Sequence, residues 1–269
     1  MFTKVLIANR GEIAVRIIRA CHELGIQTVA VYSEADREAL HTQLATQAIC
    51  IGPAKASDSY LNMTSILSAA VVTGAQAIHP GFGFLSENSA FATMCEEMNI
   101  RFIGPSSTII DLMGNKANAR RTMIAAGVPV TPGSEGYISS YEEAVVQAEK
   151  IGYPVILKAA AGGGGKGMRK VYQENGLEAA FSQAKAEAKA AFGDDSMYLE
   201  KIITPARHIE VQILGDSFGN VVHLGERDCS LQRNHQKVLE ESPSTFISEE
   251  TRKAMGDVAI RAAKHVGYT

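Results

Sequence analysis

The sequence predicts an α/β fold that begins as a doubly wound parallel sheet and later changes to antiparallel strands. Short apolar runs alternate with helix-like stretches to about residue 104, as in a chain of βα units. After a Gly- and Pro-rich linker at 127–133, strands with alternating apolar and polar residues replace that rhythm. The 269 residues, 46% of them hydrophobic, are enough for about two domains.

The first elements form a βαβ unit. An apolar strand at 4–8 is followed by a turn, a helix over 13–24 with apolar residues at helical spacing, and a second strand at 28–32. A connection this short, with one helix between two strands, requires a right-handed crossover and a parallel sheet. The alternation continues with strands at 49–51, 77–79 and 101–103 and helices at 60–73 and 87–98.

The second part reads as a compact α+β module followed by a hairpin. The predicted elements are a helix at 107–126, a helix with a Ser-x-x-Glu-like start at 140–151, a strand at 154–159, a helix at 177–192, strands at 207–214 and 220–224, and a helix at 248–266. The last two strands alternate apolar and polar residues around a Gly-rich turn, which predicts an antiparallel pair. The final helix should cover that pair, and we expect this last module to be incomplete.

Composition excludes several classes of function. With 29 acidic and 26 basic groups the chain has no overall charge that would attract nucleic acid or an anionic membrane. The four cysteines never form a CxxC pair, so neither a zinc knuckle nor a disulfide framework is indicated. No apolar run approaches the ~18 residues that span a bilayer. We therefore expect a soluble cytoplasmic protein with reduced thiols.

The glycine-rich run at 158–167 is the most informative segment. Gly162, Gly164 and Gly167 satisfy GxGxxG, but strand-like residues follow where a dinucleotide-binding helix is needed. A Walker A loop fails as well, since Lys166 is followed by glycine and lacks the required upstream glycine. A glycine flap between two antiparallel strands, closing over nucleotide phosphates, remains, with a solvated linker as the alternative.

Three further segments are candidates for binding. Lys158 ends an apolar strand, where an anion best accounts for a desolvated ammonium. The strand end at 200–203 could bind an adenine ring or be an ordinary strand end. The polar run 226–237 lacks helical periodicity and is either a solvated loop or a closed site for small anions.

The segment 79–88, HPGFGFLSEN, follows a strand and precedes a helix. It therefore lies at the carboxyl edge of the first sheet, where open α/β folds bind ligands. The alternative is a structural turn in which Ser86 or Glu87 caps the helix. Lys116, in MGNK, carries little weight by itself, because lysines in the first turn of a helix are usually solvated.

Together, the motifs IANRGEIAVRIIRAC, HPGFGFLSEN, MGNK, YPVILKAAAGGGGKGMR, EKI, RHIEVQIL and GERDCSLQRNHQKVLEESPS resemble those of biotin carboxylases, which are ATP-grasp ligases. The resemblance covers essentially the whole chain. It is strongest to the biotin carboxylase subunit of bacterial acetyl-CoA carboxylase, and the same domain opens pyruvate, propionyl-CoA and methylcrotonyl-CoA carboxylases.

The resemblance implies a Rossmann-like, pre-ATP-grasp N-terminal domain followed by an ATP-grasp fold that is incomplete in its central domain. The implied parts are the N-terminal domain at 1–114, a connecting helix and linker at 115–130, a lid with the glycine flap at 131–203 and part of the central subdomain at 204–269. Biotin on a carrier protein would be carboxylated from bicarbonate through carboxyphosphate, driven by ATP.

The resemblance also implies roles for individual residues. Lys237 would bind bicarbonate. The nucleotide would be held by Lys116, Lys158, Gly164, Gly165, Glu200, Lys201, Ile202, Ile203, His208, Gln232 and His235. Mg²⁺ would accompany ATP, with its ligands beyond residue 269, and biotin would be a carrier-bound substrate. The implied partners are the biotin carboxyl carrier protein, carboxyltransferase subunits and a second copy of the full-length protein, with neither nucleic acid nor membrane.

Two departures from the family pattern affect these expectations. Phe82 replaces the tyrosine of the usual HPGYGFLSEN, so a contact through that hydroxyl is lost. The paired glutamates that hold magnesium fall outside these residues, so we expect little ATP turnover from this chain alone. Competing interpretations are another ATP-grasp ligase with a different acceptor, a non-catalytic nucleotide-binding module and, least favoured, a nicotinamide oxidoreductase.

Overall fold

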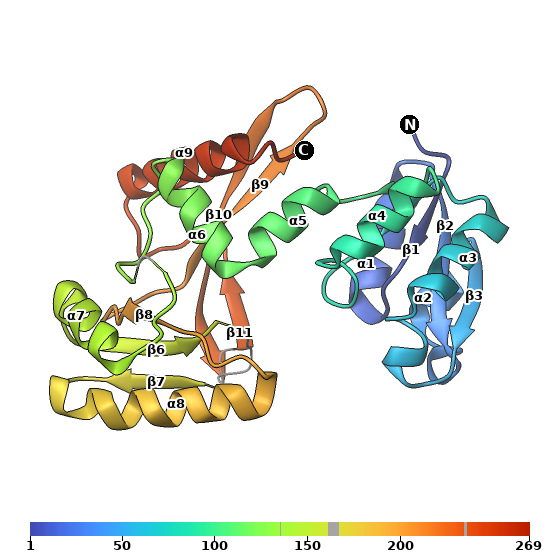
Figure 1. The fold of residues 1–269 in the computed structure, drawn as a ribbon. Coiled ribbons are helices and arrows are strands. Elements are labelled where there is room, and N and C mark those ends of the chain that lie inside the picture. Colours follow the sequence, from blue (N-terminus) through green and yellow to red (C-terminus); the bar gives the residue numbers. More distant parts are fainter. Residues whose placement is uncertain (135, 161–166, 234–235) are drawn as a thin grey trace. The chain divides into compact units, whose positions relative to one another are not determined.

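A computed structural model describes residues 1–134, 136–160, 167–233 and 236–269, without the side chains of residues 116, 117 and 192 (Figure 1). The chain divides into two compact units. Unit 1 comprises Met1–Gly114, Gly215–Val221 and Val266–Thr269, and unit 2 comprises Asn115–Leu214 and Val222–His265. Among the described residues, no helix combines the length and the hydrophobicity needed to cross a membrane.

Unit 1 contains a five-stranded sheet in the order β3-β2-β1-β4-β5, with every described pair parallel. Its strands are β1 (Lys4–Ile7), β2 (Gln27–Ser33), β3 (Gln47–Gly52), β4 (Ala77–His79) and β5 (Arg101–Phe102). The helices are α1 (Gly11–Glu23), α2 (Leu40–Leu44), α3 (Met63–Thr73), α4 (Ser89–Glu97) and α5 (Ser107–Gly114). The predicted doubly wound parallel sheet is confirmed.

Apolar side chains fill both faces of this sheet. Leu6 belongs to the larger core, together with residues of α3 and α4, whereas Ile7 packs on the opposite face with Ala14 and Ile18 of α1. Alternate residues of a strand point to opposite faces, so a strand covered on both sides must be apolar along its length. The continuous apolar runs of the sequence are therefore a consequence of the double layer of helices.

The loop after β4 lies at the carboxyl edge of the parallel sheet. The buried Asn9 Nδ2 donates to the carbonyl oxygens of Pro80 and Phe82, each at 2.8 Å. Gly81 has φ +66°, and a Cβ there would lie 2.7 Å from Asn9 Nδ2, so only glycine fits. Helix α4 is capped by Asn88, which accepts from Phe91 N at 2.8 Å, and neither Ser86 nor Glu87 is the N-cap.

Unit 2 begins with α6 (Lys116–Ala125), so the helix predicted over 107–126 is in fact two helices. Asn115 separates them, because its side chain caps α6 by accepting from Asn118 N. An antiparallel sheet of order β7-β6-β8 follows, with β6 (Val155–Ala159), β7 (Met168–Val171) and β8 (Met197–Lys201). Helices α7 (Tyr141–Ile151) and α8 (Leu177–Phe192) pack against this sheet (Figure 1).

The second sheet of this unit has the order β11-β10-β9. Its strands are β9 (Ile209–Gly215), β10 (Val221–Arg233) and β11 (Gln236–Glu241), and α9 (Glu249–His265) follows. The predicted hairpin is present, but the described residues of the polar run, 226–233 and 236–237, lie in strands, because β10 continues to Arg233 and pairs antiparallel with β11. Polar side chains hide this strand from a hydrophobicity pattern, and several of them bond to other segments, as Arg227 does to Glu210 and Glu226 does to Arg252.

Candidate functional site

The sheet β7-β6-β8 has one buried face and one open face. Val155, Leu157 and Ala159 of β6 are buried against the two helices, whereas Lys158 lies on the opposite face. In register, Lys158 stands opposite Met168 of β7 and Tyr198 of β8. Strand alternation thus delivers an ammonium group to a sheet surface that the described helices leave uncovered.

Lys158 and Glu200 form an ion pair on this open face. The lysine side chain is 27% exposed and Nζ lies 6.0 Å from the centre of the Tyr198 ring. Burial, together with the charge of Glu200, raises the pKa of Tyr198 to about 12, so its hydroxyl stays protonated at neutral pH. The arrangement combines a cation, a carboxylate and an aromatic ring at the edge of the glycine-rich run.

The predicted adenine edge at the end of β8 is only partly available. Lys201 turns away from it, and its Nζ donates to the carbonyl oxygens of Gly152 and Tyr153 at 2.8 and 2.7 Å. The amide of Ile202 donates to Pro154 O at 3.0 Å. Ile203 is 53% exposed, and no hydrogen bond within the described residues engages its amide. The amide of Lys201 donates to Pro132 O at 2.7 Å, so of these residues Ile203 is the one whose amide has no described partner.

The second sheet brings together three more of the predicted residues. Gln232 Nε2 lies 3.0 Å from His208 Nδ1, and Lys237 forms an ion pair with Glu210. His208 Nε2 lies 3.7 Å from the same carboxylate. Hydrogen bonding to Glu210 raises the pKa of Lys237, which keeps its ammonium charged. An imidazole, an amide and a cation thus meet around one glutamate.

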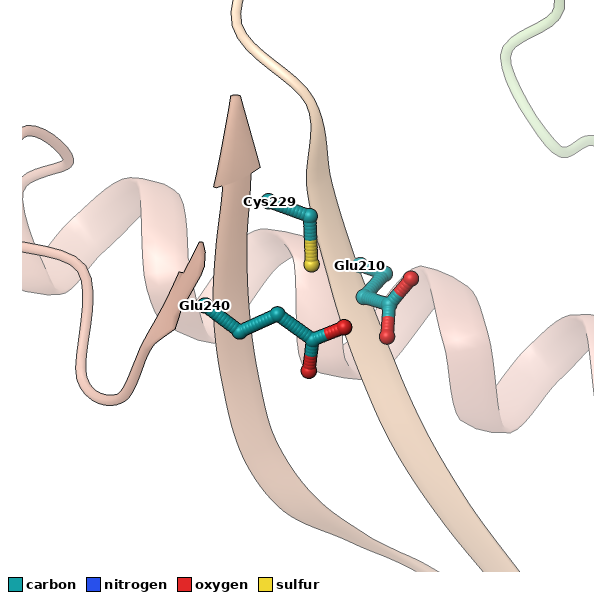
Figure 2. Close-up of side chains that lie close together, drawn as sticks. All are labelled: Glu210, Cys229 and Glu240. Carbon is teal, nitrogen blue, oxygen red and sulfur yellow. The ribbon is translucent and has the colours of Figure 1, made fainter. Parts of the chain in front are cut away.

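Glu210 also belongs to a cluster with Cys229 and Glu240 (Figure 2). One donor atom from each of the three lies within 4.8 Å of the others, as a metal site would require. However, Arg227 already donates to Glu210 at 2.7 Å, and Lys237 pairs with the other oxygen. Mg²⁺ requires hard oxygen ligands that are free of competing cations, so this cluster does not fit magnesium. It is an ion-pair network that holds Lys237.

The remaining predicted residues are not described. Gly164, Gly165 and His235 lie outside the described residues, as does the side chain of Lys116. Nearby, Gly167 has φ +67°, and a Cβ there would lie 2.8 Å from Ala159 Cβ. Only glycine therefore fits where the run re-enters the sheet.

Glu210 and Tyr198 were missed from the sequence. Each lies on a strand at alternate spacing from a predicted residue, His208 for Glu210 and Glu200 for Tyr198. Residues two apart on a strand share a face. The strand predicted at 207–214 contains both His208 and Glu210, so alternation was a usable signal there, although β9 itself begins at Ile209.

The carboxyl edge of the parallel sheet carries a self-contained cluster. Asp36 accepts from Tyr60 Oη at 2.7 Å, from Ser33 Oγ at 2.8 Å and from Arg10 at 3.4 Å. Burial alone would raise the pKa of Asp36, but these hydrogen bonds lower it overall. Tyr60 stacks on Phe84 at 5.0 Å between ring centres. Because the carboxylate of Asp36 already accepts these three hydrogen bonds, it is not free to bind a ligand.

Both units match known families. Residues 1–110 match the family described as biotin carboxylase, N-terminal domain, and residues 115–269 match that described as carbamoyl-phosphate synthase L chain, ATP binding domain. The fold and these matches define an ATP-grasp protein with a biotin carboxylase N-terminal domain. The first match separates the chain from ATP-grasp ligases that lack this domain.

The chain belongs to the biotin carboxylase family. Biotin carboxylase 1 of Bacillus subtilis is 60% identical over 269 residues, which are all of this chain and 60% of that protein. The crystal structure of a biotin carboxylase–β,γ-ATP complex from Campylobacter jejuni has a TM-score of 0.92 and 54% identity, over 100% of this chain and 60% of that one.

A second solved structure extends this comparison. It is the biotin carboxylase domain dimer of 2-oxoglutarate carboxylase from Hydrogenobacter thermophilus, in complex with MgADP, ADP and bicarbonate. Its TM-score is 0.89 at 52% identity, over 100% of this chain and 59% of that chain. The chain thus spans about 60% of the length of these relatives.

Proposed function

We propose that this chain supplies the nucleotide-binding lid and the bicarbonate lysine of a biotin carboxylase. Lys158 would hold ATP phosphates on the open face of β6, and the exposed amide at Ile203 would meet the adenine. Lys237 would bind bicarbonate through its ammonium point charge. Relatives in complex with a β,γ-ATP analogue, MgADP and bicarbonate support this proposal.

The reaction would proceed in two parts. A bicarbonate oxygen would attack the γ-phosphorus of ATP, breaking the bond to ADP and forming carboxyphosphate. Carboxyphosphate would divide into CO2 and phosphate, and the ureido nitrogen of biotin would bond to CO2 while its proton passes to phosphate. A closed site would keep water from carboxyphosphate. We do not assign that ion to the cluster of Glu210, Cys229 and Glu240, because its carboxylates already pair with Arg227 and Lys237.

The parent assembly is proposed by analogy. We propose a cytoplasmic acetyl-CoA carboxylase, with a biotin carboxyl carrier protein, carboxyltransferase subunits and a homodimer of the full-length protein. A dimer occurs in the Hydrogenobacter thermophilus relative, which belongs to a 2-oxoglutarate carboxylase. A keto-acid carboxylase, such as pyruvate carboxylase, is therefore the second candidate, because the biotin carboxylase unit serves both types.

The observation that carries the proposal is the placement of Lys158, and calorimetric titration with MgATP tests it. Lys158→Ala should weaken binding by roughly 1.5–3 kcal/mol, as expected for loss of a charge-assisted phosphate contact. Lys170→Ala is the matched control, since Lys170 is an exposed lysine opposite Ile156 on the same sheet. Lys170→Ala removes the same charge from the neighbouring strand, two residues from the position opposite Lys158, and should leave the affinity for MgATP within about twofold.

Each outcome has a defined meaning. Equal weakening by both substitutions would mean that the loss of affinity comes from the net charge of the sheet rather than from a contact of Lys158. An unchanged affinity in Lys158→Ala would show that Lys158 does not bind the nucleotide. No binding by the unsubstituted chain would contradict the proposal that these residues form the nucleotide pocket. In a longer protein that also contains the magnesium-binding glutamates, stimulation of ATP cleavage by free biotin separates a biotin carboxylase from a ligase with another acceptor and from a non-catalytic module.

A further inference from the structure

Asp228 on β10 is a buried carboxylate with four hydrogen bonds. Its side chain is 8% exposed. Oδ1 accepts from the amide and hydroxyl of Ser230 at 3.1 and 2.5 Å, and Oδ2 accepts from Arg207 Nη1 and Ser244 Oγ, each at 3.2 Å. Both oxygens are therefore committed, and three separate stretches of chain are tied to one group.

The bonds continue from Asp228 to His208. The hydroxyl of Ser230, whose proton goes to Asp228, accepts from the amide of His208 at 3.0 Å. The carbonyl oxygen of His208 accepts from Cys229 N at 2.8 Å. Both the amide and the carbonyl group of His208 are thus hydrogen-bonded. The bond from the amide depends on the rotamer of Ser230, which Asp228 sets.

Gln232 closes the arrangement on the imidazole side. Its Nε2 donates to the carbonyl oxygen of Cys229 at 3.0 Å and lies 3.0 Å from His208 Nδ1. Arg207, the residue before His208, pairs with Asp228 and lies over the ring of Phe246 at 3.9 Å. Two consecutive residues are therefore anchored by the same carboxylate, directly in one case and through a hydroxyl in the other.

We propose that Asp228 is a positioning residue that fixes His208, whose imidazole contacts Gln232, in the orientation that meets the nucleotide. The inference rests on the proposed function, because it takes these two side chains as nucleotide contacts. Asp228 acts through Ser230 and does not itself touch the ligand. Loss of the carboxylate would release both the serine rotamer and the Arg207 anchor, so the imidazole would sample other orientations before the nucleotide binds.

Glu226 provides a matched control two residues earlier on the same strand. It is 2% exposed, and its Oε1 accepts from Ser244 N at 3.0 Å and from Arg252 Nε at 2.8 Å. Like Asp228 it joins β10 to the segment containing Ser244 and to an arginine. No described hydrogen bond links it to Ser230 or His208. The two carboxylates thus differ in their connection to the imidazole rather than in burial.

The experiment compares Asp228→Asn, Glu226→Gln and Ser230→Ala in the whole chain. Calorimetry with MgATP gives the affinity, the ¹⁵N and ¹H signals of the His208 ring report its orientation and tautomer, and urea unfolding gives stability. A His208→Gln variant assigns the ring signals. Asp228→Asn should weaken ATP binding about tenfold and shift the His208 signals. Ser230→Ala should do the same with a smaller loss of stability.

Glu226→Gln should lower stability while leaving the ATP affinity within about twofold and the His208 signals unmoved. Equal weakening by Asp228→Asn and Glu226→Gln, or unmoved ring signals in both Asp228→Asn and Ser230→Ala, would overturn the proposal. If Asp228→Asn does not fold, Ser230→Ala decides the question by the same two readouts. If the unsubstituted chain does not bind ATP, the proposed function fails, and the ring signals still test the positioning separately.

Discussion

Strands β1 and β6 are both short and apolar, but they are buried in different ways. In β1, Leu6 and Ile7 are consecutive and both fully buried, because helices cover both faces of the parallel sheet. In β6, buried and partly exposed residues alternate, and only one face is covered. Side chains on both faces of β1 are committed to packing, whereas β6 carries Lys158 near its end on the uncovered face.

The polar groups near these two strands differ accordingly. Those at the carboxyl edge of the β1 sheet satisfy one another, as the contacts of Asp36 with Ser33 and Tyr60 show. Among the described residues, Lys158 instead pairs with one carboxylate, that of Glu200, on an open sheet face, and an incoming phosphate could take its place. The contrast predicts that substitutions in β1 lower the stability of the fold. In β6, one of two neighbouring substitutions should lower stability and the other should weaken ATP binding.

The largest effect is expected in β1. Leu6→Ala and Ile7→Ala should each lower the free energy of unfolding by about 2–5 kcal/mol, since each removes buried methyl groups from a different face of the sheet. Urea unfolding followed by circular dichroism measures both. A cost at only one of the two positions would contradict double-sided burial.

In β6 the neighbouring residues should behave differently. Leu157→Ala should cost about 2–5 kcal/mol, because its side chain is fully buried. Lys158→Met, on the open face, should cost about 1 kcal/mol or less for its partly exposed ion pair and should remove most of the ATP affinity. Denaturation and calorimetry on the same samples compare the two. A large stability loss in Lys158→Met would make the lysine a structural residue.

Much of the first unit could be predicted from the sequence. Apolar runs and helical spacing are set by burial, so the βα order to residue 104 and the parallel sheet were predicted, apart from short elements such as Leu40–Leu44. Lys158 also stands out in the sequence, because a lysine that ends an apolar run is conspicuous, and its role in binding stays a prediction. The N-cap of α4 is Asn88 rather than Ser86 or Glu87, and apolar periodicity does not locate the start of a helix to within one or two residues.

The second sheet was harder to predict for a physical reason. In β10 the side chains of Glu226 and Asp228 bond to other parts of the chain, so they are buried without being apolar. A pattern based on hydrophobicity registers such a strand as a loop. Glu210 escaped notice for the same reason, since its role is defined by its partners on neighbouring strands rather than by its place in the sequence.

The buried carboxylates of β10 should give unit 2 an acid sensitivity. Hydrogen bonding to Arg252 lowers the pKa of Glu226, and hydrogen bonding to Ser230 lowers that of Asp228. A carboxyl whose pKa is lower in the folded state contributes stability above its unfolded pKa of about 4 and loses it as pH falls through the folded value. The urea midpoint should therefore fall between about pH 5 and pH 3, less steeply in Glu226→Gln. An identical pH dependence in that variant would contradict this assignment.

The smallest effect is expected at the self-contained cluster of Asp36, Ser33 and Tyr60 at the carboxyl edge of the parallel sheet. The Tyr60 hydroxyl donates to Asp36 at 2.7 Å and accepts from Ser33 N at 3.0 Å. Burial and the hydrogen bond to Asp36 raise the pKa of Tyr60 to about 12. Tyr60→Phe keeps the ring stacked on Phe84 and should cost about 0.5–1.5 kcal/mol, with unchanged MgATP affinity. Weaker binding of MgATP in this variant, at unchanged stability, would show that the edge of the parallel sheet serves the nucleotide and would remove the contrast between the two strands.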